Sequence, residues 1–121
     1  MKVEHKNPPN YEAICKKFDI KNNKGVVFTY GDTVYVPSGK PLTPDLEQHE
    51  GLHIEQQAQY EGGAEAWWDR YLEDTEFRLD QETAAYGIQY KYICENENRA
   101  GRRRAIKFFT DSLSGPIYGR S

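Results

Sequence analysis

The chain has 121 residues, of which 37% are hydrophobic and 13% aromatic, and its formal net charge is -3. This length suits one modest core, so we expect residues 1–121 to form a single domain. The small charge favours neither nucleic acid nor a membrane surface as a partner. No stretch approaches the roughly 18 apolar residues of a membrane span, and residues 1–6 lack the apolar run of a signal peptide. Cys15 and Cys94 lie apart in helical patterns, which favours reduced thiols. We therefore expect a cytoplasmic protein.

The first half of the chain predicts a short helix and then a β-hairpin. After Asn10, a suitable N-cap, apolar residues recur at helical spacing over 11–18. The β-branched and aromatic runs 26–30 and 33–36 flank Gly31-Asp32. A glycine at the first of two turn positions favours a type II′ hairpin turn.

The second half predicts helices. Thr43 is typical of an N-cap and Pro44 of a first helical residue, so we expect a helix from Pro44 to residue 59 or 60, where Gly62-Gly63 ends it. Three more helices are predicted over residues 64–72, from Asp74 or Thr75 to about 93, and over 99–113. This order predicts an α+β fold that is mostly helical, with the small hairpin or sheet packed on the helix that begins at Pro44.

That helix contains the sequence His49-Glu50-Gly51-Leu52-His53, which matches the zinc motif H-E-x-x-H. Residues four apart lie one turn apart on the same face of a helix, so His49 and His53 can bind one ion. Glu50, beside the first histidine, can reach a water on the metal without ligating it. The motif predicts one Zn2+ per chain, with Glu50 as the general base of a hydrolytic reaction. The alternative is a solvated helix that contains two histidines by chance.

A catalytic zinc site needs a third protein ligand and one open position. His5 lies far upstream, so a downstream carboxylate is the better candidate. Glu82 shares a predicted helical face with Ala85, and the small alanine would let two helices approach closely. Glu76 is the main rival, and a site without a third protein ligand stays open.

Two further roles are expected around the predicted zinc. Tyr86, one turn beyond the predicted third ligand, is the candidate electrophile that would stabilise an oxyanion during hydrolysis, with Arg78 and Tyr90 as weaker candidates. A carboxylate should orient one histidine through its other ring nitrogen, and Asp80 and Glu76 are the candidates.

The motif at residues 49–53 together with Glu82-Thr83-Ala84-Ala85 resembles the gluzincin arrangement. It resembles the minimal gluzincin-like metallopeptidases, which lack the second lobe of thermolysin-like enzymes. The order of helix, hairpin, zinc helix and glutamate helix over about residues 10–93 is similar as well. The resemblance implies a zincin-like fold, with the hairpin along a shallow substrate cleft. It also implies zinc ligands at His49, His53 and Glu82, with Glu50 as base and proton shuttle.

We therefore expect a zinc-dependent hydrolase, specifically a small metallopeptidase that acts on a peptide or protein substrate. The alternative is a non-catalytic protein, such as a phage or scaffold component, that keeps the zincin fold and even the zinc. The basic run 102–104 could contact nucleic acid, but we favour the solvated face of the last helix, so no nucleic-acid partner is expected. Trp67-Trp68 is expected to anchor the core rather than to form the wall of a substrate pocket. No residue pattern predicts a defined specificity pocket, and the sequence does not determine the oligomeric state.

Overall fold

The computed structural model describes residues 1–20 and 25–113. Within these ranges the chain forms five helices and three strands, so the fold is α+β and mostly helical, as predicted. In chain order the elements are β1 (Lys2–Glu4), α1 (Tyr11–Lys17), β2 (Phe28–Tyr30), β3 (Thr33–Tyr35), α2 (Pro44–Gln59), α3 (Gly63–Glu73), α4 (Thr75–Asn96) and α5 (Arg99–Leu113). No helix in the described ranges is long and apolar enough to cross a membrane.

The predicted hairpin is confirmed. β2 and β3 are antiparallel, with Tyr30 opposite Thr33, which leaves Gly31-Asp32 as the two-residue loop. Gly31 has a φ of +65°, and no residue other than glycine has a positive φ in the described chain. A positive φ at the first loop position only is what a type II′ turn requires.

The third strand was not predicted. β1 pairs in parallel with β3, so the sheet order is β1-β3-β2. β1 has only three residues, all of them exposed, which is too short for an alternating pattern to predict a strand. The pairing continues past the strand ends, where the backbone N–H of Val36 donates to the carbonyl of Glu4 at 2.8 Å.

The helices begin where the sequence predicted, but only one of the three predicted N-cap residues makes a capping hydrogen bond with its side chain. α2 begins at Pro44 and α1 follows Asn10, but the side chains of Thr43 and Asn10 make no capping hydrogen bond. Asp74 does cap α4, because its Oδ1 accepts from the backbone N–H of Phe77 at 3.0 Å. α4 continues to Asn96, beyond the predicted end at about 93.

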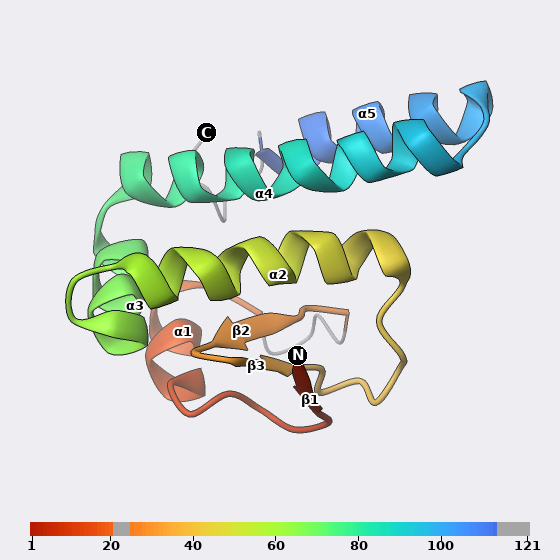
Figure 1. The fold of residues 1–121 in the computed structure, drawn as a ribbon. Helices are drawn as coiled ribbons and strands as arrows, with labels where there is room; N and C mark the ends of the chain where they lie inside the picture. The colour runs from red at the N-terminus through yellow and green to blue at the C-terminus, as the bar shows by residue number, and fades with distance from the viewer. Residues whose placement is uncertain (21–24, 114–121) are drawn as a thin grey trace.

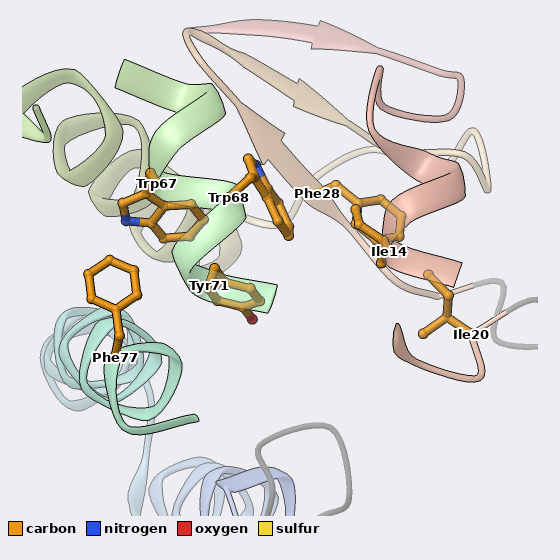
Figure 2. Packing of buried hydrophobic residues seen from close by; sticks show 7 residues of the cluster. All are labelled: Ile14, Ile20, Phe28, Trp67, Trp68, Tyr71 and Phe77. Carbon is orange, nitrogen blue, oxygen red and sulfur yellow. The ribbon is translucent and has the colours of Figure 1, made fainter. Parts of the chain in front are cut away.

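Figure 1 shows α2 between the small sheet and α4, with α5 packed on α4 and α3 at one end of α2. A cluster of buried apolar side chains joins α1, β2, α3 and the start of α4 (Figure 2). Its members are Ile14, Ile20, Phe28, Trp67, Trp68, Tyr71 and Phe77. The predicted role of the two tryptophans in the core is therefore confirmed. This arrangement buries the middle of α2, where the histidine motif lies.

Candidate metal centre

Three buried side chains from α2 and α4 converge on one point. His49 and His53 lie one turn apart on α2, and Glu82 lies opposite them on α4. Glu82 Oε1 is 3.0 Å from His49 Nε2 and 3.1 Å from His53 Nε2, and the two Nε2 atoms are 3.2 Å apart. Ligands bound tetrahedrally to one zinc at about 2.0–2.2 Å lie roughly 3.4 Å from one another. The triad is therefore compact enough to hold a metal ion.

The close approach of the two helices has a visible sequence basis. Ala85, one turn beyond Glu82, is completely buried, and its methyl group takes little space on the face of α4 that carries the carboxylate. Glu76, the rival ligand, is exposed in the first turn of α4 and does not belong to the triad. Of the two carboxylates weighed from the sequence, the packing brings only Glu82 to the histidines.

A chain of hydrogen bonds fixes the ring of His49. Its Nδ1 lies 2.9 Å from Gln89 Oε1, and Gln89 Nε2 donates to Asp45 Oδ2 at 2.7 Å. Because the amide donates to Asp45, its oxygen has to face the histidine, so Nδ1 carries the proton. The lone pair of Nε2 then points into the triad, as a metal ligand requires.

His53 is held in the same way by another amide. Its Nδ1 lies 2.7 Å from Gln56 Oε1, and Gln56 Nε2 donates to the carbonyl of Gln81 at 3.1 Å. The expectation that Asp80 or Glu76 would orient a histidine is wrong, since both are exposed and neither contacts a ring. Gln56 lies three residues after His53, a spacing that brings side chains together on a helix and that could have identified it.

Replacing Gln89 with leucine should weaken metal binding without removing a ligand. Leucine keeps most of the volume of the buried amide but cannot accept from His49 Nδ1, so the ring loses its orientation. We expect the affinity for Zn2+ or Co2+ to fall about 10- to 100-fold, measured by competition with a chelating dye. Gln59→Leu, an exposed change on α2, serves as the control. Equal affinity of Gln89→Leu and wild type would contradict this role.

With both Nδ1 atoms protonated, the lone pairs of the two Nε2 atoms and Oε1 of Glu82 face one another. This set is stable only with a cation or a proton between its members. Burial lowers the pKa of His53, but the charge of Glu82 and its hydrogen bond outweigh burial and raise the pKa to about 9. Burial raises the pKa of Glu82, but the positive charge of His53 and the hydrogen bond that His53 donates hold the pKa of Glu82 far below its usual range. In the metal-free protein a proton therefore occupies the position that suits a metal.

Metal binding should therefore release a proton and depend on pH. Because the pKa of His53 is raised to about 9, the metal competes with this proton at every pH below 9. We expect the affinity to rise with pH by about tenfold per unit, or roughly 100-fold between pH 6 and 8, and to level off above pH 9. Calorimetry in buffers of different ionisation enthalpy measures the released proton directly. An affinity independent of pH would contradict the assignment, and His5→Ala should keep the full dependence, because His5 is exposed and outside the triad.

Tyr71 supports the carboxylate of the triad. Its hydroxyl donates to Glu82 Oε2 at 2.7 Å, which leaves Oε1 to face the histidines. The ring of Tyr71 also packs in the core, stacked on Trp67 with the ring centroids 4.9 Å apart. A single tyrosine thus joins the apolar cluster to the triad, a contact that no local pattern reveals.

Glu50 lies beside the triad and is not one of its members. Its Oε1 accepts from the hydroxyl of Thr29 at 2.8 Å, and its Oε2 is 3.8 Å from His49 Nε2. Thr29 is held in turn, because its carbonyl accepts from Gln57 Nε2 and from Trp68 Nε1, each at 2.8 Å. Burial raises the pKa of Glu50, and the nearby histidines offset part of that increase. Sequence reasoning missed Thr29 and Gln57, since their contacts join β2 to α2 and α3.

The three candidate electrophiles differ in where they lie relative to the triad. The ring of Tyr86 packs edge-on against His49, with the centroids 4.5 Å apart. Arg78 is buried away from the triad, where its Nη1 donates to the carbonyl of Tyr71 at the end of α3. Tyr86 lines the cavity beside the triad, whereas Arg78 and Tyr90 do not.

A cavity of about 490 Å³ opens beside the triad. His49, His53 and Glu82 line it together with Glu50. Apolar side chains form much of the remaining wall, among them Ile14, Phe18, Ile20, Phe28, Trp67 and Trp68. The tryptophans are thus both core residues and cavity walls, and the chain has a pocket that no residue pattern predicted.

Comparisons with models of known protein families, with curated proteins and with solved structures found no match. The chemistry of the site therefore has to be inferred from its own geometry.

Proposed function

We propose that the triad binds one zinc ion and that the protein is a zinc-dependent hydrolase, specifically a small metallopeptidase. The main support is the position of Glu50, a buried carboxylate that borders the triad without belonging to it. Burying a carboxylate is costly, and a purely structural zinc site gains nothing from a second carboxylate that does not bind the metal. The arrangement suits a base next to an open coordination position.

Zinc, when bound, would supply a Lewis acid that lowers the pKa of water and polarises a carbonyl group. Glu50 is placed to accept a proton through Oε2, since Oε1 is occupied by Thr29. Burial raises the pKa of this carboxyl in the metal-free protein, and after accepting a proton the same group can return it to the leaving amine. Tyr86, on the cavity wall, is the proposed donor to the developing oxyanion.

The resemblance to minimal gluzincin-like metallopeptidases supports the peptidase form of this proposal. The ligand set His49, His53 and Glu82 matches that resemblance, as does the hairpin packed on the motif helix. The zincin-like fold is part of the same proposal. The alternative, a non-catalytic protein of this fold that retains zinc, has no observation of its own in its favour.

The test is metal-dependent cleavage of a peptide library. We expect one zinc per chain by elemental analysis, and new peptide termini by mass spectrometry only when zinc is present. Removal of zinc by a chelator should stop cleavage, and stoichiometric zinc should restore it. Zinc binding with no cleavage of any library peptide would favour the non-catalytic alternative, and no zinc binding at all would contradict the metal centre.

A further inference from the structure

The cavity continues from the triad into an apolar region between α1, β2 and α3. Figure 2 shows Ile14, Ile20 and Phe28 grouped on one side and the rings of Trp68 and Tyr71 on the other. All five line the cavity. The hydroxyl of Tyr71 donates a hydrogen bond to Glu82, so the apolar region adjoins the triad.

The size of this cavity indicates a binding site rather than a packing defect. Protein interiors contain few voids larger than a water molecule, because an empty apolar cavity destabilises the fold. Small-molecule sites commonly enclose about 300–1,000 Å³ of mostly apolar walls with a few polar groups at one point. The cavity of about 490 Å³ matches this description, with the triad and Glu50 as its polar groups.

The charge of the lining excludes some occupants. Three carboxylates line the cavity, Glu50, Glu82 and Asp111, and none of the described lining residues is a lysine or an arginine. Among the described lining residues, a free carboxylate of a substrate would therefore meet negative charge and no cationic side chain. The lining suits an uncharged, apolar group and disfavours the C-terminal carboxylate that a carboxypeptidase would bind.

We propose that the cavity is the specificity pocket for a large apolar side chain, aromatic or leucine-like, next to the bond that is cleaved. This inference rests on the proposed function, because it takes the triad to hold the zinc. The substrate class is then a peptide whose internal, uncharged segment places such a side chain between Ile14 and Trp68.

A pair of hydroxamic acids tests the pocket on the zinc-loaded protein. Acetohydroxamic acid can ligate zinc but has no side chain, whereas 3-phenylpropionohydroxamic acid adds a phenyl group. We expect the phenyl compound to bind roughly 10- to 100-fold more tightly, as burial of an aromatic side chain implies. The chain contains two tryptophans, Trp67 and Trp68, and both line the cavity, so intrinsic fluorescence reports its occupancy. Equal affinities, with no tryptophan response, would overturn the pocket.

Matched variants test whether the preference for the phenyl compound arises in the cavity. Ile14→Phe narrows the cavity and should reduce the advantage of the phenyl compound over acetohydroxamic acid to less than about 3-fold. Ile88→Phe makes the same change on an exposed face of α4 outside the cavity and should keep the full advantage. If Ile14→Phe does not fold, Val27→Phe, at a half-buried position on the cavity wall, replaces it. An unchanged preference in the folded wall variant would overturn the assignment.

A titration of the metal-free protein tests the pocket independently of zinc binding. N-acetyl-phenylalaninamide and N-acetylalaninamide have no zinc-binding group, and they are titrated against metal-free protein. Tighter binding of the phenylalanine derivative supports the pocket, and equal or absent binding of the two compounds overturns it. If neither hydroxamic acid binds the zinc-loaded protein, the proposed metal centre fails, and the amide pair still decides the pocket.

Discussion

Glu50→Gln is expected to keep the zinc and to lower the rate of peptide hydrolysis by roughly 10²- to 10⁴-fold, the usual contribution of a general base. Glutamine has the same shape as glutamate and can still accept from the hydroxyl of Thr29, so the packing around position 50 should persist. What it cannot do is take a proton. Because the side chain at position 50 is not part of the triad, the affinity for zinc should change little.

The measurement pairs kinetics with metal content. Cleavage of a library-derived peptide gives kcat and KM, and we expect the loss in kcat, since the proton transfer belongs to the chemical step. Glu55→Gln, an exposed change on the same helix, is the matched control and should leave both parameters unchanged. Full activity of the zinc-loaded Glu50→Gln variant would exclude Glu50 as the base, and loss of its zinc would instead assign position 50 to the metal shell.

Glu82→Gln is expected to reduce zinc affinity by more than about 10³-fold, well beyond the effect of a supporting hydrogen-bond partner. The substitution removes the negative charge that faces both Nε2 atoms at 3.0 and 3.1 Å. It also removes the anion that holds the His53 pKa at about 9, so the metal-free variant should bind fewer protons at neutral pH. His49→Ala and His53→Ala should lose zinc to a similar extent.

Thermal unfolding gives a second measure of zinc binding, independent of activity. Zinc should raise the midpoint of the wild type and not that of Glu82→Gln, because only bound metal stabilises the folded state. Glu76→Gln is the control, since Glu76 was the rival ligand and is exposed. Retained zinc binding in Glu82→Gln, with loss in Glu76→Gln, would move the third ligand to position 76.

Elements with strong local signals were predicted well. The helix that begins at Pro44 and the Gly31-Asp32 turn follow from backbone preferences of proline and glycine, which act within a few residues. β1 was missed because its pairing with β3 joins segments some thirty residues apart and its side chains are all exposed. Such a strand is defined by its partner and not by its own residues.

The groups that support the triad were predicted less well than the triad itself. Carboxylates were expected behind the histidines, whereas the structure places the amides of Gln56 and Gln89 there. A buried amide can serve because its oxygen accepts from Nδ1 while its nitrogen donates elsewhere, to Gln81 and Asp45. Both ends have to be satisfied at once, and that condition depends on the relative position of α2 and α4.

The arrangement of His49, Glu50 and His53 is determined locally by the sequence. Positions i and i+4 place the two histidines on one face of a helix, with Glu50 beside them, whatever the rest of the chain does. Long-range packing decides the rest. The packing of α4 on α2 brings Glu82, and not Glu76, to the histidines, and the small side chain of Ala85 is completely buried one turn away. The apolar pocket exists only because α1, β2 and α3 meet around a space beside the triad, and no short segment contains the information for a cavity whose walls come from elements so far apart in the chain.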